Sequence, residues 1–305
     1  MMYRTLGSTG LKVSVVGLGT WQLGGEWGKQ FTPEEVNGIF DAAREHGITL
    51  VDTAECYGDH LSERLVGGAV KADRDRWIIA TKFGHRYTTP LERDQLWAPA
   101  DVQRQLEGSL AALAVDAIDL YQFHSGPNAV FENDALWTML DKQKKAGKVR
   151  HLGISIGSSM SAEDQVRQAQ RAREVGAESL QVVYNRLQRG PQESIFPVCR
   201  RDNLGVLARV PLASGFLSGK YGEGTRFGAD DFRSRKTGKE LDAMAAEALR
   251  IKAEEVPTGV AMAAWALSWC LRDETVTAVI PGCKNPEQVQ QNANAVRLLA
   301  ETSHP

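Results

Sequence analysis

The sequence predicts an α/β fold, a (β/α)8 TIM barrel in which eight parallel strands are surrounded by helices. Short apolar runs alternate with helical patterns along nearly the whole chain, and this alternation is typical of βα units around a parallel sheet. The apolar runs number eight, the count that closes such a barrel. Neither a linker rich in Pro, Gly and Ser nor an internal repeat divides the chain, so we expect one domain over residues 1–305.

Two irregular segments accompany the strands. A hairpin-like segment, Tyr3–Val15, opens the chain, with its turn at Gly7-Ser8-Thr9-Gly10. A polar loop runs from Ser218 to about Gly238 after the seventh strand, and loops of this length in a compact domain often cover a ligand. The eight expected strands are Lys12–Leu18, Thr49–Asp52, Trp77–Lys82, Ile118–Phe123, Val149–Ser155, Ser179–Val183, Gly205–Val210 and Val276–Pro281.

Capping patterns mark three helix starts. Thr32 precedes a proline and is followed three residues later by a glutamate, as in a capping box. Asn285 precedes Pro286 in the same way and predicts the start of the last helix. Asp101 is the expected cap of the helix that contains Leu106.

The charge balance argues for a small-molecule partner. Lys and Arg number 36 against 38 Asp and Glu, a formal net charge of -2, which removes the electrostatic reason to expect nucleic acid or an anionic membrane. No window reaches the ~18 apolar residues of a membrane span, and no signal peptide is recognisable, so we expect a cytoplasmic protein. Cys56, Cys199, Cys270 and Cys283 form no CxxC pair, which indicates free thiols.

Two other patterns resemble ligand-binding motifs, but their spacing or position favours a structural role. The glycines of Gly17–Gly24 follow a strand, but the third comes too late for a dinucleotide fingerprint, so they indicate a tight βα turn. Asp59, His60 and Glu63 are metal-ligand types, but we expect them to open a helix beside solvent and predict no metal site.

Polar residues at the strand ends provide a stronger signal. Asp52, Lys82 and His124 each end an apolar run, and Tyr57 follows in a loop. Each alone has a structural explanation, as an ion pair, a core histidine or a packing residue. Together, at the strand ends where barrel enzymes build their sites, they form a chemical unit. Lys82 is expected to lower the Tyr57 pKa from ~10 by about two to three units, Asp52 to keep the lysine charged, and His124 to bind a carbonyl oxygen.

These residues and their neighbours resemble the aldo-keto reductase superfamily from about Tyr3 to Val296. The matching stretches are Val51-Asp52-Thr53-Ala54-Glu55-Cys56-Tyr57-Gly58 with Ser62-Glu63, Ala80-Thr81-Lys82-Phe83-Gly84, Asp119–His124, Gly147–Ser155, Pro211–Leu217 and Val279–Gln288. The resemblance implies a barrel closed at its base by the hairpin, and reversible reduction of aldehydes or ketones by NADP(H). It assigns Tyr57 as general acid, tuned by Lys82 and Asp52, and His124 as the group that orients the carbonyl.

The resemblance also implies a set of coenzyme contacts. Ser155 and Gln181 would hold the nicotinamide carboxamide, the backbone from Leu212 to Lys220 would wrap the pyrophosphate, and the loop to Gly238 would cover it. The full expected set is Gly19, Thr20, Trp21, Ser155, Gln181, Arg209, Pro211, Leu212, Ser214, Gly215, Leu217, Ser218, Lys220, Gly282, Lys284, Gln288, Gln291 and Asn292.

The chain departs from the family pattern at three coenzyme positions. Ile156 stands where many members have Asn, and Arg209 stands where many have an aromatic residue that stacks on the nicotinamide. Gln288 replaces a common basic residue, which leaves Lys284 as the expected contact of the adenosine phosphate and the reason to expect NADPH. Trp21 has a substrate-facing role or a packing role at the pocket rim.

Two alternatives share this pattern. One is an NAD-dependent polyol dehydrogenase that runs the same chemistry in reverse. The other is a regulatory binding protein, because β subunits of voltage-gated potassium channels resemble this family and share its four catalytic residues. No long extension precedes Tyr3 in this sequence, which counts against a channel role. The sequence predicts that the segment Phe83–Asp101 contributes to the substrate pocket, and it makes no prediction of oligomeric state.

Overall fold

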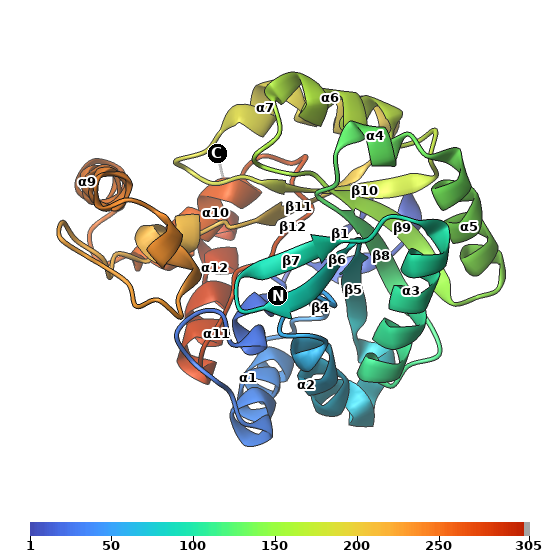
Figure 1. The fold of residues 1–305 in the computed structure, drawn as a ribbon. Coiled ribbons are helices and arrows are strands. Elements are labelled where there is room, and N and C mark those ends of the chain that lie inside the picture. Colours follow the sequence, from blue (N-terminus) through green and yellow to red (C-terminus); the bar gives the residue numbers. More distant parts are fainter. Residues whose placement is uncertain (302–305) are drawn as a thin grey trace.

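A closed barrel of parallel strands forms the centre of the protein, and helices surround it (Figure 1). The computed structural model describes residues 1–301. The barrel strands are β3 (Leu18–Gly19), β4 (Leu50–Asp52), β5 (Ile78–Phe83), β8 (Ile118–His124), β9 (Val149–Ser155), β10 (Ala177–Val183), β11 (Gly205–Arg209) and β12 (Ala278–Val279). They are hydrogen-bonded in the order β12-β11-β10-β9-β8-β5-β4-β3, and parallel bridges from Val16 to Val279 and from Gly19 to Gly282 join the two outermost strands. The predicted TIM barrel is confirmed.

An antiparallel hairpin covers the base of the barrel. Its strands are β1 (Tyr3–Thr5) and β2 (Lys12–Ser14), with a 3-10 turn between them. Leu6 and Val13 are fully buried in one cluster with inward-facing residues of the barrel. The first predicted strand was therefore wrong: Lys12–Leu18 is not one strand, because its first part belongs to the hairpin. Ser14 Oγ donates to the carbonyl of Val16 at 2.7 Å, so the chain turns before β3 begins.

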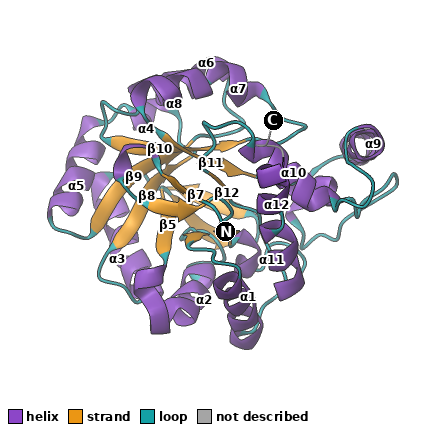
Figure 2. Ribbon diagram, turned by 180° about the vertical axis from the view of Figure 1, so that it is seen from behind, coloured by secondary structure: helices purple, strands orange, loops and turns teal. Residues whose placement is uncertain are grey.

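The helices pack around the strands, as Figure 2 shows from the opposite side. They are α1 (Pro33–Glu45), α2 (Leu61–Val70), α3 (Pro99–Leu113), α4 (Asn128–Phe131), α5 (Asp134–Lys145), α6 (Ala162–Arg171), α7 (Gly190–Ser194), α8 (Phe196–Asp202), α9 (Gly238–Glu254), α10 (Met262–Leu271), α11 (Pro286–Ala293) and α12 (Ala295–Glu301). Among residues 1–301, no helix is long and apolar enough to cross a membrane.

Two of the three predicted helix starts are confirmed. Thr32 and Glu35 form the expected capping box of α1, and the Asn285 side chain caps α11. The third was wrong, because α3 begins at Pro99 and Asp101 lies inside its first turn. Proline has the fixed φ of a first helical residue, so the helix starts there, and the Asp101 carboxylate acts on the positive end of the helix dipole.

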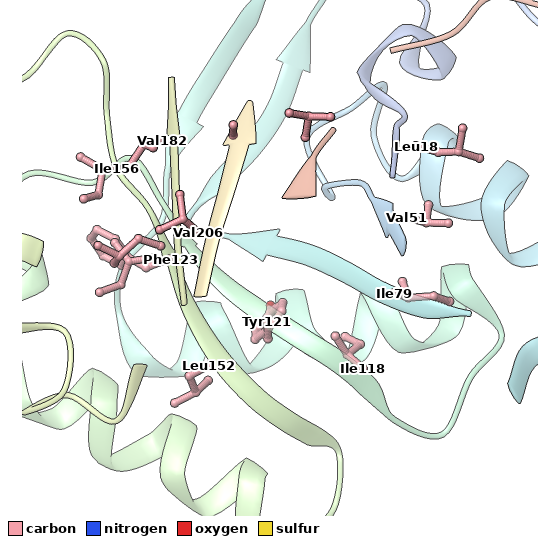
Figure 3. Close-up of a cluster of buried hydrophobic side chains, with 14 of the residues drawn as sticks. Leu18, Val51, Ile79, Ile118, Tyr121, Phe123, Leu152, Ile156, Val182 and Val206 are labelled. Atoms are coloured by element: carbon pink, nitrogen blue, oxygen red, sulfur yellow. The ribbon is translucent and has the colours of Figure 1, made fainter. Parts of the chain in front are cut away.

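Side chains alternate along each strand between the outer apolar core and the barrel interior, where the polar residues lie. Outward-facing apolar side chains of neighbouring strands pack together, and Figure 3 labels ten of them, from Leu18 to Val206. The residues between them face the barrel interior. Toward the carboxyl ends these inward positions become polar, with Asp52 on β4, Lys82 on β5 and Gln181 on β10, all buried. The fold therefore brings polar side chains of different strands together at one end of the barrel.

Two excursions extend beyond the strand ends. A second hairpin, β6 (His85–Thr89) and β7 (Glu92–Gln95), follows β5 directly. The predicted long loop follows β11 and leads to α9, and it contains a 3-10 turn at Phe232–Arg235. Both excursions contribute residues to the cavity described below.

Candidate active site

Three of the four predicted catalytic residues meet at a single ammonium group. Lys82 Nζ donates to Asp52 Oδ2 at 2.6 Å, to the carbonyl of Thr53 at 2.8 Å and to the Tyr57 hydroxyl at 3.1 Å. The Lys82 side chain is only 1% exposed, so the charge is desolvated and needs these partners. The chain therefore places a phenol, an ammonium group and a carboxylate in one hydrogen-bonded line.

Tyr57 is held in place by close loop packing. A Cβ at Gly58 would lie 2.5 Å from the carbonyl oxygen of Gly24, so only glycine lets the two loops approach. The Tyr57 ring stacks on Trp21, with centroids 5.9 Å apart, and meets the ring of His124 edge-on at 6.3 Å. His124, at the end of β8, thus completes the predicted group of four.

Burial dominates the electrostatics of these groups. It raises the pKa of Tyr57 to about 12, although the charge of Lys82 lowers it. The net shift is therefore opposite in sign to the one expected from Lys82 alone. Burial also lowers the pKa of Lys82, but Asp52 and Tyr57 outweigh it and the pKa lies above its ordinary value. At neutral pH the tyrosine is a protonated phenol and the lysine is charged.

The histidines beside the tyrosine are neutral. Burial, with the nearby cations, lowers the pKa of His124 well below its ordinary value. The ring of His85, from β6, stacks on that of His124 with centroids 4.7 Å apart, and burial lowers the His85 pKa to about 4. His85 falls within the segment Phe83–Asp101 that the sequence predicts to contribute to the pocket, but a histidine outside the barrel strands gives no signal of this stacking.

A cavity of about 930 Å³ opens at the carboxyl ends of the strands. Asp52, Tyr57 and His124 line it. The predicted coenzyme residues that also line it are Gly19, Thr20, Trp21, Gln181, Arg209, Pro211, Leu212, Ser214, Gly215, Ser218, Lys220, Gly282, Lys284, Gln288, Gln291 and Asn292. Ser155 is buried beneath the cavity, and Leu217 is buried in the apolar cluster formed with α9 and α10.

The cavity suits a ligand with several phosphates. Lys220, Arg235, Lys236 and Lys284 line it and supply positive charge from two different loops. The Lys284 ammonium group donates to the carbonyl of Trp27 at 2.5 Å, which fixes its position at the cavity. Cations and helix N-termini are the groups that bind phosphates in proteins, so these residues fit a dinucleotide coenzyme.

The two residues expected to hold a carboxamide belong to a buried polar network. Gln181 Nε2 donates to Asp52 Oδ1 at 2.7 Å and to Gln122 Oε1 at 3.2 Å. Ser155 Oγ donates to Gln181 Oε1 at 3.4 Å. Both ends of the Gln181 amide therefore have partners inside the barrel, and they link Asp52 to β8, β9 and β10. Gln122 was not predicted, since a lone glutamine in an apolar strand carries no specific signal.

An ion pair between the buried Glu26 and the partly buried Arg93 lines the cavity. Both carboxylate oxygens of Glu26 accept from Arg93 Nη2, at 2.6 and 2.5 Å, and Glu26 also accepts from Trp21 Nε1 and from the backbone N–H of Leu91. The backbone carbonyl of Glu26 accepts from the N–H of Phe232 at 3.0 Å. One glutamate therefore joins the loop after β3, the second hairpin and the long loop. The sequence reasoning missed this pair, because its members lie 67 residues apart on loops.

We expect Glu26→Gln to lower the free energy of unfolding by about 2–4 kcal/mol, since it leaves the Arg93 charge buried without a carboxylate. Urea denaturation measures this loss. In the double variant Glu26→Gln/Arg93→Met the loss should be smaller, because no charge is left unpaired. The control Glu107→Gln breaks an exposed ion pair with Lys148 and should cost less than about 1 kcal/mol. A loss no larger than that of this control would contradict the role of Glu26.

The group of Asp59, His60 and Glu63, which we expected beside solvent, is partly buried. Glu63 is fully buried, accepts from Thr81 Oγ1 at 2.6 Å and lies 2.5 Å from His60 Nδ1. The expectation was wrong for Glu63, because this side chain points from α2 onto β5. In residues 1–301, no group of three or more His, Cys, Asp or Glu side chains is placed to hold a metal ion.

Comparison with known proteins gives a consistent assignment. The model of the aldo/keto reductase family matches residues 15–303. The aldo-keto reductase YhdN of Bacillus subtilis (strain 168) is 34% identical over 241 residues, 77% of this chain and 69% of that protein. A probable voltage-gated potassium channel subunit beta of Arabidopsis thaliana is 27% identical over 308 residues, 98% of this chain and 92% of that protein.

Solved structures agree with this assignment. The aldo-keto reductase AKR11C1 from Bacillus halodurans, in its holo form, is 29% identical with a TM-score of 0.79, over 97% of this chain and 91% of that one. The glycerol dehydrogenase AKR11B4 from Gluconobacter oxydans has the same identity and TM-score, over 96% and 89%. The chain therefore belongs to the aldo/keto reductase family, whose enzymes are oxidoreductases of carbonyl compounds that use nicotinamide coenzymes.

Proposed function

We propose that the protein is an NADP(H)-dependent oxidoreductase that reduces aldehydes or ketones to alcohols, with Tyr57 as the general acid. The observation that carries this proposal is the 3.1 Å contact between Lys82 Nζ and the Tyr57 hydroxyl beside the cavity. A protonated phenol next to a buried ammonium group is a proton donor toward a ligand in the cavity. The partner is accordingly a small carbonyl compound.

Each residue of the group has a distinct role in the proposed reaction. The reduced coenzyme supplies the hydride when bound. Tyr57 donates its proton to the carbonyl oxygen, and Lys82, kept charged by Asp52, stabilises the negative charge that the phenol oxygen acquires. The neutral ring of His124 donates a hydrogen bond to the same carbonyl oxygen and fixes its orientation.

Lys284 supports a preference for the coenzyme with the extra phosphate. It lines the cavity directly before Asn285, the cap of α11. The first turn of a helix carries partial positive charge and free N–H groups, which favour an anion. We propose that the adenosine phosphate of NADPH binds here, and that Gln288 and Asn292 of α11 lie beside it.

We expect NADPH to bind about tenfold to a hundredfold more tightly than NADH, because a charge-assisted contact contributes roughly 1.5–3 kcal/mol. Dissociation constants of both coenzymes, measured by fluorescence titration, test this in the parent and in Lys284→Ala. The preference should shrink in the variant. As a control, Lys142→Ala removes an exposed lysine of α5 and should leave both constants unchanged. Equal affinities in the parent, or the same ratio in Lys284→Ala, would refute the assignment.

A second candidate is an NAD-dependent polyol dehydrogenase, favoured by the likeness to the glycerol dehydrogenase from Gluconobacter oxydans. Turnover of aldehydes, ketones and polyols with both coenzymes separates the candidates. Reduction of carbonyls with NADPH supports the first, and oxidation of polyols with NAD⁺ alone supports the second. A role as a channel subunit, as in the name of the Arabidopsis relative, in place of catalysis predicts no turnover of any of them.

A further inference from the structure

Arg209 carries a positive charge that no carboxylate balances. It ends β11 and lines the cavity, yet within residues 1–301 it forms no ion pair with a carboxylate. Its Nη2 donates to the carbonyl of Ile156 at 3.1 Å, and its buried Nε has no hydrogen-bond partner in the part of the chain that the structure describes. Arg209 is partly buried, and a cation withdrawn from water is costly unless a charged or polar group pairs with it, so its charge is available to a ligand in the cavity.

The other charges near the tyrosine cancel in pairs. Asp52 is paired with Lys82, and Glu26 is paired with Arg93. His85 and His124 are neutral at pH 7, since burial lowers the pKa of each. Beside these pairs, Arg209 contributes a further positive charge that acts on Tyr57, Asp52 and His124.

The guanidinium group of Arg209 reaches from β11 to the backbone just after β9. β11 pairs with β10, and β10 pairs with β9, so the bond from Arg209 to the carbonyl of Ile156, just after β9, spans the end of β10. Tyr57 and His124 stand on the other elements around the same cavity. Hydride transfer to a carbonyl bound at Tyr57 requires the nicotinamide ring within contact distance of the carbonyl carbon. A ring bound there lies in the same cavity that Arg209 lines.

We propose that Arg209 makes this pocket discriminate between the redox states of the nicotinamide, holding the neutral reduced ring more tightly than the cationic oxidised ring. In carbonyl reduction the carbonyl carbon takes a hydride, two electrons with one hydrogen, from the reduced ring. The oxygen takes the Tyr57 proton, and the ring is left with one positive charge. That charge appears beside Arg209 and is repelled by it. An uncharged aromatic residue in the same position would not oppose it.

This inference rests on the proposed function and has a direct binding test. Dissociation constants for NADP⁺ and NADPH, and separately for NAD⁺ and NADH, are measured by titration calorimetry without substrate. The ratio of oxidised to reduced constants within each pair cancels any contribution from the adenosine phosphate. We expect a ratio of at least about tenfold in the parent and a ratio near one in Arg209→Gln.

Two further variants separate charge from structure. Arg209→Lys keeps the charge, so it should keep most of the ratio even though its hydrogen bonds differ. Lys236→Gln removes another cation of the cavity, from the long loop, and should weaken both redox forms alike without changing the ratio. Thermal unfolding of each variant confirms that it is folded, and if Arg209→Gln is not, Arg209→Met is measured in its place.

The outcomes distinguish this inference from the proposed function. If both redox forms bind but the ratio stays the same without the arginine charge, Arg209 does not set it and the inference is overturned. If neither coenzyme binds to the parent, the proposed function itself fails. A ratio that falls in Arg209→Gln and persists in Arg209→Lys supports both.

Discussion

Tyr57→Phe should abolish most carbonyl reduction, by about 10²–10⁴-fold in kcat, while changing coenzyme affinity by less than about twofold. The substitution removes the hydroxyl that lies 3.1 Å from Lys82 Nζ and leaves the ring contacts with Trp21 and His124 in place. Proton donation is lost while the walls of the cavity are kept. Steady-state turnover of a good aldehyde substrate, together with a coenzyme titration, measures the two effects separately.

The matched control is another buried tyrosine. Tyr121, on β8, is fully buried in the outer core, and its hydroxyl has no hydrogen-bond partner among residues 1–301. Tyr121→Phe makes the same chemical change away from the cavity, so its turnover should equal that of the parent. Near-parental turnover in Tyr57→Phe would show that another group donates the proton.

Lys82→Met should have the second largest effect on activity. The ammonium group lowers the pKa of Tyr57 against the effect of burial, so removing it raises that pKa above about 12. Alcohol oxidation needs the deprotonated phenol, and its rate increases as the pH rises toward this pKa. The rise should therefore move to higher pH in the variant, and oxidation at neutral pH should fall at least about tenfold. The pH profile of kcat for alcohol oxidation measures the shift.

A double variant distinguishes an effect on the Tyr57 pKa from a loss of activity through misfolding. Lys82→Met alone leaves the Asp52 carboxylate buried without its ion-pair partner, which destabilises the fold. Asp52→Asn/Lys82→Met removes both charges and keeps the approximate volumes, so it should be folded. Its profile should move in the same direction but by less, because the Asp52 charge raises the pKa of Tyr57. A profile that coincides with that of the parent would contradict the coupling between Lys82 and Tyr57.

The strand-end residues were predictable because the barrel fixes where they go. Once Asp52 and Lys82 are placed at the ends of neighbouring parallel strands, the geometry of the sheet brings them together whatever the loops do. The order of the apolar runs predicted the end of the barrel at which the cavity lies, and the family resemblance implied most of the residues that line it.

What the sequence did not predict depends on loops and on burial. Glu26 and Arg93 meet only because two loops and a hairpin fold over the same cavity, and loop conformations are not set by a residue pattern. The rise in the Tyr57 pKa follows from its degree of burial, which composition does not reveal. β3 has only two residues and follows other apolar residues, so the residue pattern does not show where this strand begins.

The closure of the barrel between β3 and β12 also has a consequence for biosynthesis. The N–H of Gly17 donates to Val279, and that of Gly19 donates to Pro281, so the first barrel strand finds one of its two neighbours about 260 residues later. During synthesis, the edge of this strand that pairs with β12 therefore stays unpaired until β12 has been made. Gly19 and Gly282, which pair across this closure, both line the cavity, so the wall of the cavity is completed only after this late pairing.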